Sequence, residues 1–405
     1  MCDIIFLFFD FFCIFAVFWT YICVMGVLRG AFFIVGGAIG AGFVSGAELV
    51  RFFPSEKFFW AALLSSALFA LCCALLLKTG KRHGGYAGVL KALFKRGAPV
   101  ANALFLLCAL VPSAGMLAGL DALLPTYKPL FSVLGLALSC LFLGRGMKGV
   151  SLLNALLVPV LLGFVFFAAR GEKNLLSFSF FLPWRGFAGG VVYAGLNMFL
   201  IAPVLMDAGV QMKRPALSAF LAGVLVLGAA CCILGKIYGG GGAALHAEMP
   251  FLFVMQGKKV FSVAVALAIL TSLVSSLYPL MAACGRLSGK KKYAAEGFTL
   301  LAAFVLSRLG LGGIVSYLYP VLGFFGLTLS VLCVFHDYLF KQHHKKVHSR
   351  RKQAQKEGGA HHEVELEHLP AVHDEVAQPR AGNDILAHDR ADPRHAHVHL
   401  QHRNE

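Results

Sequence analysis

The sequence predicts an all-α polytopic membrane protein whose spans form a five-plus-five inverted repeat. Three observations predict this class: an apolar composition, ten apolar stretches, and a nearly constant spacing between two sets of five. Of the 405 residues, 58% are hydrophobic and 14% are charged, whereas a soluble domain is about 45–50% apolar and about 25% charged. A lipid bilayer is therefore the expected environment.

The ten candidate spans follow one another from Arg29 and are joined by short loops. A helix that crosses a bilayer needs about 20 mostly apolar residues, and most of the stretches reach or approach that length. They cover residues 29–53, 58–77, 98–120, 130–144, 149–169, 186–207, 215–238, 259–284, 294–309 and 312–336. We expect residues 26–340 to form a single ten-span core.

Basic residues in the loops predict the orientation of these spans. The formal charge of the chain is +16. The side that holds Arg29 carries 15 Lys and Arg, the opposite side carries 10, and the tail from Lys341 adds 11 to the first side. Cytoplasmic loops carry the excess of Lys and Arg. We therefore expect a protein of the bacterial cytoplasmic membrane with Arg29 and the tail in the cytoplasm.

The two ends of the chain differ from the core. Residues 1–25 are apolar but include Asp10, and they lack the basic region and cleavage site of a signal peptide. Three interpretations stand: an eleventh helix, an uncleaved signal anchor, or wrongly joined upstream sequence with the start at Met25, which we favour. Residues 341–405 hold 12 of the 15 histidines, and their polar composition predicts a disordered cytoplasmic tail.

Several functional classes find no support in the motifs. The 11 cysteines lie in apolar segments without metal-ligand spacing. No basic soluble face with aromatic residues is visible, which argues against a nucleic-acid partner. No nucleophile–base pair, HExxH or Walker A motif occurs, so the sequence does not predict an enzyme. No cofactor is expected beyond a bound sodium ion.

The spacing between spans indicates an internal repeat. Spans 1 and 6 begin 157 residues apart, as do spans 2 and 7, and the remaining pairs are offset by 161, 164 and 163 residues. Repeat 1 then covers about residues 29–169 and repeat 2 about residues 186–336. Because five spans is an odd number, the second copy enters the membrane from the opposite side. Inverted repeats of this kind are common in secondary transporters.

The most interrupted spans of the two halves are partners in this repeat. Span 1 contains GGAIGAGFVSGAE from Gly36 to Glu48, and span 6 reads GFAGGVVYAGLNMFLIAPVLMDAG around Asn197. Glycine costs roughly 1 kcal/mol relative to alanine inside a helix. Backbone groups freed at mid-membrane are tolerated only where they line a cavity or bind a ligand. We therefore predict discontinuous helices 1 and 6 around a binding site. Helix packing through the spaced glycines is the alternative.

The motifs LRGAFFIVGGAIGAGFVSGAE and YAGLNMFLIAPVL resemble spans 1 and 6 of the YkvI-type bacterial membrane proteins. The resemblance covers roughly residues 27–340. This group looks like a distant branch of the amino acid–polyamine–organocation superfamily. The resemblance implies the LeuT-type fold and symport driven by sodium or protons.

The resemblance also implies an ion site between spans 1 and 8. GGAIGAG aligns with the span-1 break of the LeuT-type sodium symporters, which places the carbonyls of Gly36 and Ile39 at an ion. Span 8 reads LAILTSLVSSLYP, and its pattern gives Thr271 and Ser272 as hydroxyl ligands, with Ser275 one turn on. Oxygen ligands suit hard cations. Phe43 stands where those symporters carry an Asn of their other sodium site, so one ion or a proton is expected.

The same break predicts a substrate site. A freed helix N-terminus attracts anions, so the amides of Ala41 and Gly42 are expected to face a substrate carboxylate. The predicted substrate-binding residues are Gly40, Ala41, Gly42, Ser45, Tyr193 and Asn197.

Glu48 is ionisable and lies about two turns beyond the break. Ionisable residues inside a span are usually functional, which predicts a gate or a proton carrier. The alternative is that Glu48 reaches the membrane interface and pairs near Arg51.

Together these patterns predict a secondary active transporter for a small solute, amino-acid-like or another small organic ion, coupled to a sodium or proton gradient. The alternative is a transport-inactive membrane scaffold or sensor that keeps the same fold.

Overall fold

The structure is a computed structural model that describes residues 26–54, 57–123, 129–170, 184–255 and 259–336. The predictions for residues 1–25 and for the tail from Lys341 lie outside these residues. Every regular element in the described ranges is helical.

The helices match the ten predicted spans closely. Seven described helical stretches are long and apolar enough to cross a membrane, and two shorter apolar helices accompany them. The span helices are α2 (Gly26–Ala38) with α3 (Ala41–Val44) and α4 (Ala47–Phe52), α5 (Phe59–His83), α7 (Ala98–Leu123), α8 (Leu130–Leu143), α9 (Gly146–Ala168), α10 (Trp184–Gly209), α11 (Pro215–Gly239), α14 (Lys259–Cys284) and α15 (Lys290–Leu306). The tenth span follows a turn at Gly310 and runs through α16 (Gly310–Gly313), the π-helical η4 (Ile314–Leu318) and helical residues 319–336.

Short helices lie between the spans. They are α6 (Tyr86–Phe94) and η1 (Lys95–Gly97) before α7, α12 (Gly242–Leu245) and α13 (Pro250–Val254) before α14, and η3 (Ser307–Leu309) after α15. Except for η3, the extra helices thus fall between spans 2 and 3 and again between spans 7 and 8, at equivalent places in the two halves.

Helix packing shows the five-plus-five repeat directly. In such a repeat, every packed pair of helices recurs with its span numbers shifted by five. Span 1 packs on span 7 (α2 on α11), and span 6 packs on span 2 (α10 on α5). Span 4 packs on span 8 (α8 on α14), and span 9 packs on span 3 (α15 on α7). The predicted fold class is therefore confirmed by contacts within this chain.

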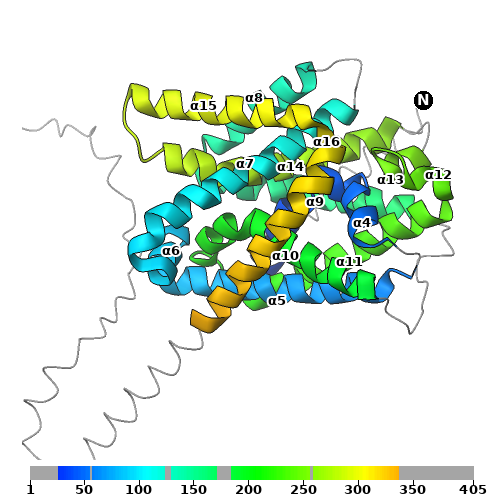
Figure 1. The fold of residues 1–405 in the computed structure, drawn as a ribbon, viewed down its shortest axis with the longest axis horizontal. Coiled ribbons are helices and arrows are strands. Elements are labelled where there is room, and N and C mark those ends of the chain that lie inside the picture. Colours follow the sequence, from blue (N-terminus) through cyan, green and yellow to red (C-terminus); the bar gives the residue numbers. More distant parts are fainter. Residues whose placement is uncertain (1–25, 55–56, 124–128, 171–183, 256–258, 337–405) are drawn as a thin grey trace, which may run out of the picture. The chain divides into compact units, whose positions relative to one another are not determined.

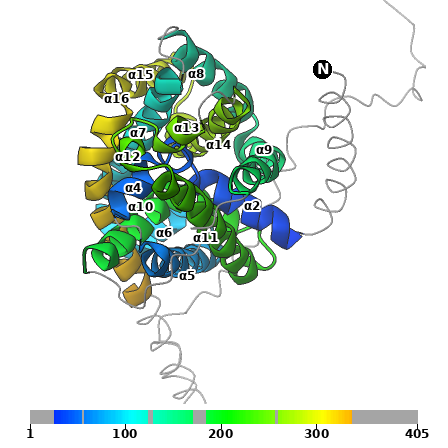
Figure 2. The ribbon, with the colours of Figure 1, turned by 90° about the vertical axis from the view of Figure 1, so that its right-hand side faces the viewer.

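The helices of one repeat are interleaved with those of the other. Helices α8 and α15, which are spans 4 and 9, lie together on the side of the bundle away from α5, which is span 2 (Figures 1 and 2). The tenth span, drawn in orange, crosses between these two sides (Figure 1). Each half consequently buries its apolar surface against the other half.

The break in span 1 is confirmed. Helix α2 ends at Ala38, and the amide of Gly40 donates to the carbonyl of Ala38 at 3.1 Å rather than to that of Gly36. A second interruption follows at Gly46, whose φ of 81° is a left-handed conformation that glycine adopts easily. The carbonyl at this second interruption, that of Ser45, accepts a hydrogen bond of 2.8 Å from the amide of Phe251 on α13.

The predicted discontinuity of span 6 is wrong, because α10 is one helix from Trp184 to Gly209. Its glycines serve close packing instead. A Cβ on Gly190 would lie 2.8 Å from the carbonyl oxygen of Ala61, and one on Gly189 or Gly195 would collide with the backbone of Phe52 or Gly323. Several glycines within one span are typical both of a broken helix and of a closely packed helix. In α10, close packing is the physical reason for the glycines.

Candidate functional site

The break in span 1 brings two of the predicted ion ligands to a hydroxyl of span 8. The Oγ of Ser272 on α14 lies 3.0 Å from the carbonyl oxygen of Gly36 and 2.9 Å from that of Ile39. Both carbonyls are available because the helix is interrupted directly after them. One hydroxyl proton cannot satisfy two carbonyl acceptors at once, so this position is rich in acceptors and short of donors.

The other two predicted hydroxyls face the backbone of α14. Thr271 donates through Oγ1 to the carbonyl of Ala268 at 2.8 Å, and Ser275 donates to the carbonyl of Thr271 at 2.9 Å. Such bonds leave the oxygen lone pairs free to accept. Thr271 and Ser275 are both buried, and their assignment as ion ligands stays a prediction.

Asn154 on α9 belongs to the same region, although the sequence reasoning missed it. Its Nδ2 donates at 3.3 Å to the carbonyl of Phe33 and at 3.3 Å to Oγ of Ser275. A Cβ on Gly36 would lie 2.6 Å from Cγ of Asn154, so the two residues are in close contact. The Oδ1 of Asn154 is buried and has no hydrogen-bond partner among the described residues. The available signal was a lone Asn inside the apolar run SLLNALLVP, the same signal that singled out Asn197.

All the donors and acceptors at this position are uncharged. No group of three or more His, Cys, Asp or Glu residues that could hold a metal ion occurs in the described parts of the chain. Carbonyl, hydroxyl and amide oxygens at a helix break suit a hard monovalent cation better than a transition metal.

The predicted substrate residues of span 1 are buried at the break, and two of their predicted ligand groups, the amide of Ala41 and the hydroxyl of Ser45, already form hydrogen bonds. The amide of Ala41 donates to Sδ of Met116 on α7 at 3.2 Å. Ser45 donates through Oγ to the carbonyl of Gly42 at 3.3 Å. Gly40 lies against Met116 as well, because a Cβ there would collide with that side chain. The break is therefore closed on the α7 side.

Glu48 turns inward to the break and contacts α10. The Tyr193 hydroxyl donates to Oε2 of Glu48 at 2.9 Å, and Glu48 is 1% exposed. A Cβ added to Gly42 would overlap the Glu48 carboxylate. The alternative of an interfacial pair with Arg51 is wrong, since Arg51 is exposed while the carboxylate of Glu48 points into the bundle.

Tyr193 and Asn197 lie one turn apart on the continuous helix α10, and their assignment as substrate-binding residues stays a prediction. Asn197 donates through Nδ2 to the carbonyl of Tyr193 at 3.0 Å, which leaves its buried Oδ1 without a partner in the described chain. Phe52 and Phe53 pack against the Tyr193 ring, with centroid distances of 5.0 and 5.4 Å.

Two cavities differ sharply in size. A cavity of about 10 Å³ lies beside Phe43, Tyr193 and Asn197, which is at the lower limit for one water molecule. A cavity of about 590 Å³ opens beside α4, the α12–α13 segment and the turn into α16, and Arg51 and Glu248 line it. Its α4 wall includes Ala47 and Val50. We call it the α4 cavity. The basic-loop prediction places it on the outer side.

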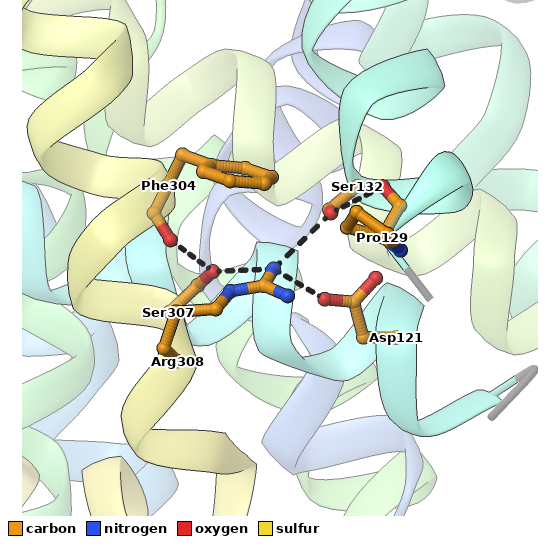
Figure 3. Close-up of polar contacts among 6 residues, drawn as sticks. All are labelled: Asp121, Pro129, Ser132, Phe304, Ser307 and Arg308. Atoms are coloured by element: carbon orange, nitrogen blue, oxygen red, sulfur yellow. Dashed lines mark hydrogen bonds and ion pairs between the residues drawn. The ribbon is translucent and has the colours of Figure 1, made fainter. Parts of the chain in front are cut away.

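A charged network away from the break joins three spans (Figure 3). Arg308, after α15, binds Oδ2 of Asp121 on α7 at 2.5 Å and the hydroxyls of Ser132 and Ser307 at 3.3 and 3.1 Å. Its guanidinium lies 4.4 Å from the centre of the Phe304 ring. Sequence reasoning missed this network because 187 residues separate the two charges.

A second network at the opposite end of the spans centres on Asp207, near the end of α10. Its Oδ1 accepts a bond of 2.7 Å from the amide of Tyr86, the first residue of α6, and its Oδ2 accepts one of 3.3 Å from the hydroxyl of Tyr278 on α14. Asp207 thereby links the segment between spans 2 and 3 to spans 6 and 8. The sequence offered only an acidic residue near the end of a span as a signal.

These features define a multi-pass helical membrane protein with a five-plus-five inverted repeat and a broken first span. The chain is 27% identical over 319 residues to the Uncharacterized membrane protein YkvI of Bacillus subtilis (strain 168), covering 71% of this chain and 90% of that protein. It is 23% identical over 241 residues to the Uncharacterized protein YyaD of the same organism, covering 56% and 71%. The homology to YkvI agrees with the predicted resemblance, whereas the superfamily assignment stays a prediction.

Among solved structures, the chain resembles that of Mhp1, a nucleobase-cation-symport-1 family transporter, in a closed conformation with bromovinylhydantoin bound. The TM-score is 0.47 at 15% identity, covering 77% of this chain and 74% of that one. No protein-family model matches the chain.

Proposed function

We propose that this protein is a secondary active transporter, which moves a small solute across the bacterial cytoplasmic membrane by alternating access and couples it to a sodium gradient. One observation carries the proposal. The helix break in span 1 presents the carbonyls of Gly36 and Ile39 to the hydroxyl of Ser272 in the middle of a membrane bundle. Irregular backbone at membrane depth occurs where it lines a cavity or binds a ligand.

The ion site links two helices of different repeats. Gly36 and Ile39 belong to span 1, and Ser272 belongs to span 8. A sodium ion held by all three would stabilise the arrangement in which α2 and α14 are in contact. Because a ligand shifts a conformational equilibrium only through its different affinity for the two states, an ion that bridges the two helices is suited to control their separation.

The substrate site in this proposal adjoins the ion site. Ile39 is followed directly by Gly40, Ala41 and Gly42, the predicted substrate residues at the break. In the described state the adjacent cavity of about 10 Å³ is too small for a solute, whereas the α4 cavity holds about 590 Å³. Alternating access then requires movement at α4 to join the two spaces.

The test is uptake by the full-length protein in proteoliposomes. A defined library of small solutes is offered outside, and the accumulated solutes are identified by mass spectrometry, with an inward sodium gradient, an inward proton gradient, or neither. We expect accumulation of at least one solute that depends on the sodium gradient. Accumulation driven only by the proton gradient would identify the proton, rather than sodium, as the coupling ion. The absence of gradient-driven uptake would favour the scaffold alternative.

A further inference from the structure

The carboxylate of Glu48 is buried among uncharged groups. Among the described residues, Tyr193 on α10 donates a hydrogen bond to it, and the nearby Tyr319 of span 10 is buried as well. Arg51, the basic residue of the same helix, is exposed. No described Lys, Arg or His forms an ion pair with Glu48. Burying an unpaired carboxylate is strongly unfavourable, so this site calls for a positive partner or a proton.

One acceptor near Glu48 is free to take a hydrogen bond from a ligand. The Nδ2 of Asn197 donates a hydrogen bond to the carbonyl of Tyr193, whereas its Oδ1 has no partner in the described chain and can accept one. The hydroxyl proton of Tyr193 goes to Glu48. The amide of Ala41, which was predicted to bind a substrate carboxylate, donates to Met116 instead. An incoming carboxylate would therefore meet the like charge of Glu48, and the amide of Ala41 is not free to bind it.

We propose that the solute bound at this site is a small organic cation, such as a protonated amine, whose positive group pairs with Glu48 and donates to Oδ1 of Asn197. This inference rests on the proposed function and names its substrate class. It replaces the earlier expectation of an anionic group at Ala41 and Gly42. A like-charged substrate carboxylate would be repelled, and the positive head group supplies the counter-ion that the described protein lacks.

The α4 cavity supplies a route to Glu48. Ala47 lies directly before Glu48 in α4, and Val50 lies two residues after it; both line that cavity. Phe52 and Phe53, which follow in the same segment, pack on the Tyr193 ring. A shift of α4 that turns Glu48 away from Tyr193 would bring its carboxylate toward the cavity that Ala47 and Val50 line.

The experiment compares two probes of the same skeleton, n-butylammonium and butyrate, by thermal unfolding of the full chain in detergent. The variants are wild type, Glu48→Gln and the control Glu296→Gln, which removes a carboxylate from a partly exposed position that faces Lys292. We expect n-butylammonium to raise the melting temperature of wild type and of the control, and butyrate to leave both unchanged. In Glu48→Gln the apparent affinity for n-butylammonium should fall at least about thirtyfold, as for loss of one partner of a buried charge pair.

Three outcomes overturn the inference: stabilisation by butyrate instead of n-butylammonium, stabilisation by neither probe, or unchanged n-butylammonium affinity in Glu48→Gln. If Glu48→Gln does not fold, the melting temperatures of the wild type with n-butylammonium and with butyrate still test the inference. Loss of proton-driven uptake in Glu48→Gln with unchanged amine affinity would make Glu48 a proton carrier. Gradient-driven uptake of anionic solutes alone would overturn the substrate class while the proposed transport function stands.

Discussion

The hydroxyl of Ser272 and the carbonyl of Ile39 are 233 residues apart in the sequence and 2.9 Å apart in the structure. This contact connects the break in span 1 to the middle of span 8. The proposed ion site is therefore a property of the folded bundle rather than of either helix alone.

Replacing Ser272 by Ala should remove most of any sodium-dependent stabilisation, because it deletes the hydroxyl that meets both carbonyls. A ligand at a hundredfold excess over its Kd stabilises by about 2.7 kcal/mol, which sets the scale of the loss. The measurement is thermal unfolding in sodium and in potassium. Ser139→Ala is the matched control, since Ser139 is a buried hydroxyl bonded only to its own helix. An equal sodium response in Ser272→Ala and the control would remove Ser272 from the site.

Asn154→Ala should lower both stability and sodium response. It removes the donor to Phe33 and Ser275, and an unsatisfied buried polar group costs about 1–3 kcal/mol. Thermal unfolding without sodium reports the first effect, and the sodium titration reports the second. If stability falls but the sodium affinity is unchanged, Asn154 has a packing role only.

Gly42→Ala should impair transport and destabilise the protein, because the new Cβ overlaps the carboxylate of Glu48. Overpacking of this kind typically costs about 1–3 kcal/mol. The control is Gly163→Ala in α9, where a Cβ meets nothing within 4 Å and alanine should be neutral or stabilising by up to about 1 kcal/mol. Uptake in proteoliposomes and thermal unfolding are measured for both. Wild-type behaviour of Gly42→Ala would contradict the described contact.

Arg308 and Asp121 should show energetic coupling in a double-mutant cycle. Removing one partner of a buried ion pair costs about 3–5 kcal/mol. Because the Arg308 side chain is 41% exposed and that of Asp121 is 7% exposed, we expect a smaller coupling of about 1–3 kcal/mol, reduced by salt. The exposed pair Lys292–Glu296 is the control and should give at most about 0.5 kcal/mol. Equal coupling in the two pairs would contradict a stabilising role for this network.

The sequence predicted the spans well because partition into a bilayer depends on apolar length alone. The seventh span, predicted over residues 215–238, forms the helix Pro215–Gly239. The break at Gly40 and the meeting of Gly36, Ile39 and Ser272 also followed from sequence and resemblance. These features depend on local pattern and on a repeat that spacing reveals.

Most other contacts between distant residues could not be predicted from the sequence. The glycines of α10 read as helix breakers because their neighbours, such as the Phe52 backbone that approaches Gly189, are set by tertiary packing. The sequence favoured an interfacial and an inward position of Glu48 equally, because the rotation of the short helix α4 decides which way the side chain points. Asn154, like Asn197, is a lone Asn inside an apolar span. Its closeness to Gly36 could not be predicted, because it depends on how the spans pack in the folded protein.

The hydrogen bond from the amide of Phe251 to the carbonyl of Ser45 ties α13 to the end of α3, directly before the turn at Gly46. Moving α3 away from α13 would leave both backbone groups without a partner in a buried place. Any movement of the break that displaces Ser45 must then carry the α12–α13 segment with it, so a covalent link that holds this segment in place should hold the break in its described arrangement.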